Sequence, residues 1–324
     1  MAVSINHSWW RLVFLLGALF TDAALAWGQG AGRNPNGTPT FPFDFSNPER
    51  MMERMFGASS PEEQRLLDAV KVSIDDEQTF GAPIVKSFLN SLKDEGTQVV
   101  DEGADIAYLE KLVETVRPLT ANPDRYGQIK IYLIDTPKVD ARAFPGGTLF
   151  FTRGLLDECG SEAALIGLIG HELSHLDRGH VLVPLKRARL MQQAPAGFAN
   201  GFQNGFNPDQ FFGNAMTTMR MMGRPFRPED EAEADRDGVA WAIEAGYDPL
   251  EMAKVFARAA QKMQDPNFPF ADFFRSHPRN DDRVAAIQDQ VSRLRRKGAR
   301  RKKLYRGVEN LAQRIPKSEQ QFEE

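Results

Sequence analysis

The spacing of apolar and polar residues divides the chain into helical and strand-like stretches. Apolar residues recur every three or four positions from 61 to 119, which predicts helices. The stretch 128–134 alternates, and 148–152 follows the turn Pro145-Gly146-Gly147, so both are predicted to be strands. The same patterns and their start and stop residues predict further helices over 161–178, 228–245, 249–262 and 280–303. We therefore expect an α+β fold that is mainly helical, with a small β-sheet.

The helix predicted over 161–178 carries the most informative residues of the chain. Residues 163–170 are almost all apolar, so this helix is expected to be buried. The sequence His171-Glu172-Leu173-Ser174-His175 follows directly. Positions i and i+4 of a helix share one face, so both imidazoles can bind one metal ion, and Glu172 can accept a proton from a water beside it. The alternative, two surface histidines on a polar face, does not fit the apolar flank.

A zinc site with two histidines needs a third protein ligand. The candidates are the acids within 229–235, at the start of a predicted helix. Steps of 3.6 residues from Glu231 lead to Asp235 and Gly238, on a face of small residues suited to close helix packing, whereas Glu233 lies on the polar face. We therefore predict that Glu231 binds one Zn²⁺ per chain and that Asp235 orients a ligand imidazole by a hydrogen bond.

The first residues have the features of an export signal. Arg11 precedes the apolar run Leu12–Phe20, and Ala24-Leu25-Ala26 follows it. This pattern predicts a signal peptide over 1–26, cleaved near Ala26, and hence a periplasmic or secreted protein; an uncleaved anchor is the alternative. The mature chain is predicted to have no transmembrane helix. Residues 27–60, rich in Gly, Asn, Pro and Phe, are expected to form a disordered linker.

Two further stretches have unusual compositions. Residues 194–225 contain Gly-Phe pairs every four residues and then a group of Met. They form either a poorly ordered cover of apolar surface or a mobile lid over a peptide cleft. The stretch Arg293–Lys303 holds eight basic residues in eleven, which indicates a solvated helix end or a contact with a membrane surface or acidic partner.

Composition narrows the class of protein. The 324 residues carry a net charge of −4 and are 42% hydrophobic, as in ordinary globular proteins. Cys159 is the only cysteine, which excludes a disulfide within the chain and argues against a structural zinc module closed by cysteines. Nucleic acid is not expected as a partner of an exported chain.

Together these motifs resemble the M48 family of zinc metallopeptidases, in the gluzincin group, and most closely its small exported bacterial-type members. The resemblance covers roughly residues 75–290 and rests on three stretches, namely 143–156, Glu231-Ala232-Glu233-Ala234-Asp235, and Ser276-His277-Pro278 followed by Arg283. One departure is Arg142, where the family often has Asn. The resemblance implies a zincin-like peptidase domain over 61–303, including the insertion 194–225, followed by a C-terminal tail over 304–324.

The resemblance also implies roles for individual residues. His171, His175 and Glu231 resemble the zinc ligands, Glu172 the general base and Asp235 the acid behind a ligand. His277 matches a histidine near the metal, either as an oxyanion donor or as a removable fourth ligand, and Arg283 would support its loop. The residues that resemble the edge strand pairing with an extended substrate are Gly147, Thr148, Leu149 and Phe150.

The function implied is a zinc-dependent endopeptidase that cleaves unfolded or misassembled envelope proteins by metal-activated water. Because an edge strand holds the substrate backbone, side chains would be read weakly, which suits protein quality control. The alternative is a largely latent peptidase that acts as a chaperone or assembly factor for envelope proteins.

Overall fold

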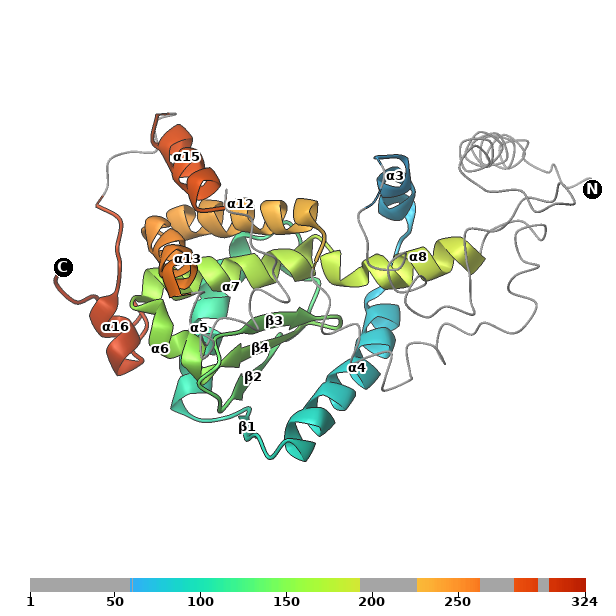
Figure 1. Ribbon diagram of the computed structural model, residues 1–324, viewed down its shortest axis with the longest axis horizontal. Coiled ribbons are helices and arrows are strands. Elements are labelled where there is room, and N and C mark those ends of the chain that lie inside the picture. Colours follow the sequence, from blue (N-terminus) through green and yellow to red (C-terminus); the bar gives the residue numbers. More distant parts are fainter. Residues whose placement is uncertain (1–58, 60, 193–225, 263–282, 297–302) are drawn as a thin grey trace, which may run out of the picture. The chain divides into compact units, whose positions relative to one another are not determined.

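The computed structural model describes residues 59, 61–192, 226–262, 283–296 and 303–324 (Figure 1). The predicted signal peptide, almost all of the linker 27–60, the insertion 194–225, His277 and residues 297–302 of the basic stretch lie outside the described residues. Within the described ranges, no helix is long and apolar enough to cross a bilayer.

Helices dominate the described residues and accompany one small sheet, which confirms the predicted α+β fold class. The short 3₁₀ helices are η1 (Arg117–Leu119) and η2 (His180–Leu182). The α-helices are α3 (Pro61–Ala69), α4 (Ile74–Asp94), α5 (Ala104–Val116), α6 (Arg153–Cys159), α7 (Glu162–Asp177), α8 (Val183–Gln192), α12 (Pro228–Glu244), α13 (Leu250–Lys262), α15 (Arg283–Arg296) and α16 (Val308–Gln313).

The strand order corrects one prediction. The strands are β1 (Val99–Val100), β2 (Lys130–Ile134), β3 (Ala141–Phe144) and β4 (Thr148–Thr152), in the order β1-β2-β4-β3. β4 pairs with β2 in parallel and with β3 antiparallel, so both of its edges are occupied. The prediction that Gly147, Thr148, Leu149 and Phe150 form an edge strand is therefore wrong. β4 is buried along its whole length, as an interior strand is, and β3 is the outer strand on that side.

The turn between β3 and β4 is fixed by a buried carboxylate. Glu77 of α4 accepts hydrogen bonds from the Gly146 N–H (3.0 Å) and from the hydroxyl of Tyr126 (2.6 Å), and it also pairs with Arg125. Gly146 and Gly147 have φ values of 89° and 79°, a conformation that favours glycine. α4 thereby holds the turn that leads out of the outer strand.

Helix α7 lies between the sheet and α12 (Figure 1), contacting β3 on one side and α12 and α13 on the other. Glycines allow α7 and α12 to approach closely. A Cβ at Gly238 of α12 would lie 2.6 Å from the carbonyl oxygen of Gly167, and one at Gly170 would lie 2.9 Å from the Gly238 Cα. Only glycine fits such a crossing, which fixes the distance between the side chains that the two helices direct at each other.

The C-terminal segment is part of the folded unit. The first-turn N–H groups of α7 need acceptors outside the helix. Glu162 N–H donates to the Gly307 carbonyl (3.0 Å) and Ala163 N–H to the Arg306 carbonyl (2.8 Å). The Glu162 carboxylate in turn accepts from the backbone N–H of Lys317 (3.0 Å). The segment 304–324, predicted from the sequence as a C-terminal tail, thus packs on the start of the buried helix and completes it.

Candidate metal centre

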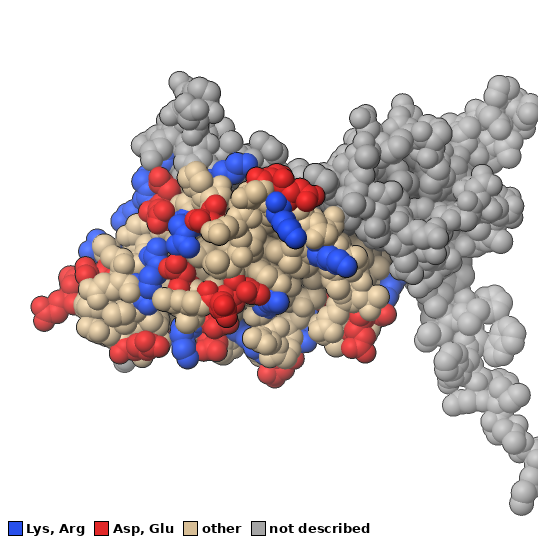
Figure 2. All heavy atoms as spheres, turned by 90° about the horizontal axis from the view of Figure 1, so that it is seen from below, with Lys and Arg blue, Asp and Glu red and all other residues tan. Residues whose placement is uncertain are grey.

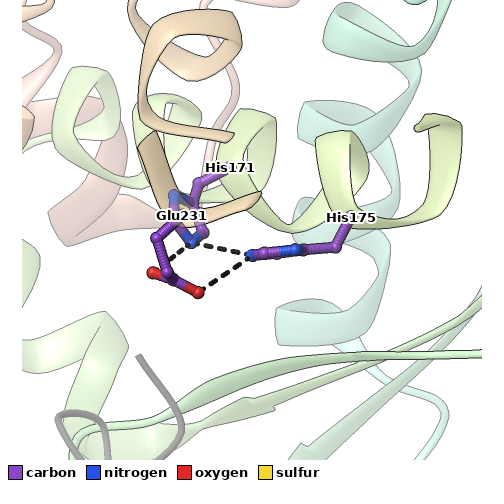
Figure 3. Close-up of side chains that lie close together, drawn as sticks. All are labelled: His171, His175 and Glu231. Atoms are coloured by element: carbon purple, nitrogen blue, oxygen red, sulfur yellow. Dashed lines mark hydrogen bonds and ion pairs between the residues drawn. The ribbon is translucent and has the colours of Figure 1, made fainter. Parts of the chain in front are cut away.

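Three buried side chains converge where α7 passes α12 (Figure 3). His171 and His175 lie one turn apart on α7, and Glu231 comes from the first turn of α12. The Nε2 atoms of the two histidines are 3.1 Å apart, and each lies 3.5 Å from a different carboxylate oxygen of Glu231. The structure thus brings together the three residues that the sequence selected as ligands, with their ligand atoms all within 4.8 Å of one another.

The chemistry and spacing of these donors fit a zinc ion. Ligand atoms about 2.0–2.2 Å from one ion at tetrahedral angles lie roughly 3.3–3.6 Å apart, close to the distances found here. The charges fit as well. Among the described residues, three buried carboxylates (Glu172, Glu231 and Asp235) gather around one buried guanidinium, that of Arg283. A divalent cation would offset the two remaining negative charges, which are costly to bury alone.

Asp235 holds the imidazole of His171 from behind. Its Oδ1 lies 2.9 Å from the His171 Nδ1, which leaves Nε2 for a metal. Arg283 of α15 binds the same carboxylate with two hydrogen bonds of 2.7 Å. Burial alone would raise the pKa of Asp235, but the Arg283 charge and the His171 hydrogen bond outweigh it and hold this pKa below its usual value. Arg283 therefore acts on Asp235 directly, whereas the resemblance assigned it to the His277 loop.

Glu172 lies next to His171 on α7 and is 1% exposed. Burial lowers the pKa of Arg283, but the charges of Asp235 and, to a smaller extent, Glu172 raise it above its usual value. The Glu172 carboxylate therefore lies near Arg283, in the same buried region. Its placement is compatible with a base that acts on a water held beside the histidines.

One histidine of this centre, His180, was not predicted from the sequence. The Nδ1 of His180, in η2, lies 3.0 Å from the Nδ1 of His175, and the ring of Phe226 stacks on His175 at 3.8 Å. No helical spacing could have indicated His180, because Gly179 ends the helical path with a φ of 72°. Burial lowers the pKa of His175 well below its usual value, so the ring is neutral, as a metal ligand must be.

Comparison with known proteins gives a family match over the same elements. The model of peptidase family M48 matches residues 105–291, from α5 into α15. The chain is 25% identical over 174 residues to the beta-barrel assembly-enhancing protease of Escherichia coli (strain K12), which covers 51% of the chain and 34% of that protein. A Vibrio cholerae protein provisionally given the same name is 24% identical over 226 residues (68% and 45%).

A plant protein shows a similar likeness. The Mitochondrial metalloendopeptidase OMA1 of Arabidopsis thaliana is 26% identical over 152 residues, which cover 46% of the chain and 29% of that protein. The chain thus matches less than half of the length of each of these three relatives.

Proposed function

The chain belongs to peptidase family M48, and we propose that it is a zinc-dependent endopeptidase acting on unfolded or extended polypeptides. The observation that carries this proposal is the buried group of His171, His175 and Glu231. Two imidazoles with one carboxylate are a zinc-type donor set, and three protein ligands leave a position open for catalysis, whereas structural sites are closed by a fourth.

In this proposal the residues of the centre have separate tasks. His171, His175 and Glu231 would hold the zinc ion, which supplies a Lewis acid that lowers the pKa of a water toward neutrality and polarises the substrate carbonyl. Glu172 accepts the proton of the attacking water and returns it to the leaving amine nitrogen. His277 keeps the two roles that the resemblance gives it, oxyanion donor or removable fourth ligand.

The substrate strand is reassigned from β4 to β3, since β3 is the outer strand and contacts α7. The Thr152 N–H donates to the carbonyl of Asp140 (3.1 Å). In an antiparallel pair, hydrogen-bonded and non-hydrogen-bonded residue pairs alternate, so the pair of Ala143 with Leu149 is not hydrogen-bonded. The N–H and C=O of Ala143 therefore point away from β4. An extended peptide placed there would run beside the metal helix and be held mainly by its backbone.

The proposed biological role is quality control of envelope proteins, after export directed by residues 1–26. Two relatives support it by name, as beta-barrel assembly-enhancing proteases, and the proposal extends that role to this chain. On the face shown in Figure 2, acidic and basic side chains of the described residues are interspersed. A contact of Arg293–Lys303 with a membrane surface remains part of the proposal.

The test is cleavage of casein by the purified chain, with and without a chelator, together with the variant Glu172→Gln. Removal of the base should lower turnover by about a hundredfold to ten-thousandfold while zinc content stays at one per chain. Near-normal turnover in Glu172→Gln would contradict the assigned mechanism.

The same variant separates the alternative function. If the chain acts mainly as a chaperone or assembly factor, Glu172→Gln should still support envelope assembly in cells that lack the wild-type protein. Loss of that support together with peptidase activity would favour the peptidase.

A further inference from the structure

A histidine outside the proposed ligand set connects one ligand to the acids of α12. His180 is buried, with 5% of its surface exposed. Its Nδ1 lies 3.0 Å from the Nδ1 of His175. Its Nε2, on the other side of the ring, lies 3.3 Å from Oε2 of Glu233 and 3.6 Å from Oδ1 of Asp230. The four side chains thus form a continuous path from His175 to two carboxylates.

Only one distribution of protons satisfies this path when a metal is bound. If the Nε2 of His175 binds the ion, the proton of its neutral ring is on Nδ1 and must be donated. The Nδ1 of His180 then accepts it, so the proton of His180 is on Nε2, which faces the acceptor oxygens of Glu233 and Asp230. Each hydrogen bond of the path then has one donor and one acceptor, with one ring proton on Nδ1 of His175 and one on Nε2 of His180.

We propose that His180 is a positioning residue, which holds His175 in the tautomer and orientation that bind the metal, with Glu233 oriented behind it. The inference rests on the zinc site of the proposed function. Both histidines would then be held from behind by α12, His171 directly by Asp235 and His175 through His180. Such partners orient a ligand and raise its basicity, and their loss typically weakens metal binding ten- to hundredfold.

His180 does not act as another ligand in this arrangement. It approaches the Nδ1 side of the His175 ring, whereas His171 and Glu231 approach Nε2 on the opposite side.

The experiment measures the zinc affinity of the full chain by competition with a chromophoric chelator. His180→Leu replaces the imidazole with an apolar side chain that has no hydrogen-bond acceptor, and we expect zinc binding to be weaker by about ten- to hundredfold. His180→Asn places an amide oxygen where the imidazole Nδ1 was, so it should restore most of the affinity. Cobalt-loaded protein gives a second readout, because its visible spectrum reports ligand geometry; the spectrum should change in His180→Leu and return in His180→Asn.

A variant at a more exposed position covers the case in which a change at His180 prevents folding. Glu233, with 37% of its side chain exposed, can be changed to Gln, and zinc affinity should fall about tenfold, the low end of the same range. Glu229→Gln is the matched control on the same helix, with 47% of its side chain exposed and an ion pair with Arg227 (3.8 Å), and should bind as the wild type does.

The outcomes separate this inference from the function on which it rests. A wild-type chain that binds no zinc would overturn the proposed function and the inference with it. If the wild type binds zinc and His180→Leu and Glu233→Gln bind it equally tightly, only the proposed role of His180 is overturned. Equal loss in His180→Leu and His180→Asn, with less stable metal-free protein in both, would also overturn it, since the residue would then only fill space.

Discussion

Replacement of Gly238 by Ala should loosen the metal centre from a distance. The added Cβ would lie 2.6 Å from the carbonyl oxygen of Gly167 and 3.1 Å from the backbone nitrogen of His171, whereas ordinary contacts begin at 3.4 Å. Neither neighbour is a flexible side chain, so the strain cannot be relieved by a rotamer change. Relief requires that α12 move away from α7 by about 0.8 Å, the difference between the ordinary and the built contact.

The effect on metal binding should exceed the effect on stability. Ala is favoured over Gly within a helix by about 1 kcal/mol, which offsets much of the roughly 1–3 kcal/mol that overpacking costs. Metal sites, however, tolerate only about 0.2 Å in ligand distance. Glu231 lies seven residues before Gly238, about 10.5 Å along α12. Even if a pivot halved the displacement, about 0.4 Å would remain at Glu231, and we expect roughly tenfold or greater loss of zinc affinity.

The assay compares zinc affinity and thermal unfolding, each with and without a chelator. Gly127→Ala is the control, because a Cβ at that exposed glycine meets no atom within 4 Å. The expected pattern is a large fall in affinity in Gly238→Ala with a small change in the unfolding temperature of the metal-free protein. Wild-type zinc affinity in Gly238→Ala would refute the argument that the glycine crossing sets the ligand distances.

Three further outcomes follow from single side chains. Glu231→Ala should lose zinc whereas Glu229→Ala, exposed on the same turn, should keep it; equal metal content in the two would contradict the ligand assignment. Burial raises the pKa of Cys159 to about 12, so this thiol should react with a thiol reagent only after unfolding, and rapid labelling of native protein would show otherwise. Burial also raises the pKa of Glu162 above its usual 4.5, so the wild type should lose stability relative to Glu162→Gln as pH rises through that raised pKa; parallel unfolding profiles across this pH range would contradict it.

The parts of the centre that the sequence predicted are those set by helix geometry. His171 and His175 share a face because four residues make about one turn, and Glu231 and Asp235 share a face of α12 for the same reason. The start of this buried helix is also set locally, since the Ser161 hydroxyl accepts a hydrogen bond from the Ala164 N–H (3.3 Å), as an N-cap serine does. Local geometry was enough for these features.

The features that the sequence did not reveal depend on contacts between distant segments. β3 has only four residues and is a strand because it pairs with β4, so the position of β4 inside the sheet could not be read from its own residues. His180 lies beyond a left-handed glycine and acquires its role only where α12 passes. Segment 303–324 contains one short helix, and its place depends on the acceptors that it offers to α7.

The arrangement of α12 explains why so much of the centre depends on one helix contact. Glu231 and Asp235 lie four residues apart, so both face α7, Glu231 as the proposed ligand and Asp235 as the hydrogen-bond partner of His171. Glu233, two residues after Glu231, points about 200° away on an ideal helix. It can support the other ligand only because His180 lies beyond the end of α7 and extends to meet it. One helix therefore supplies the proposed ligand carboxylate and the carboxylates behind both histidines, Asp235 directly and Glu233 through His180.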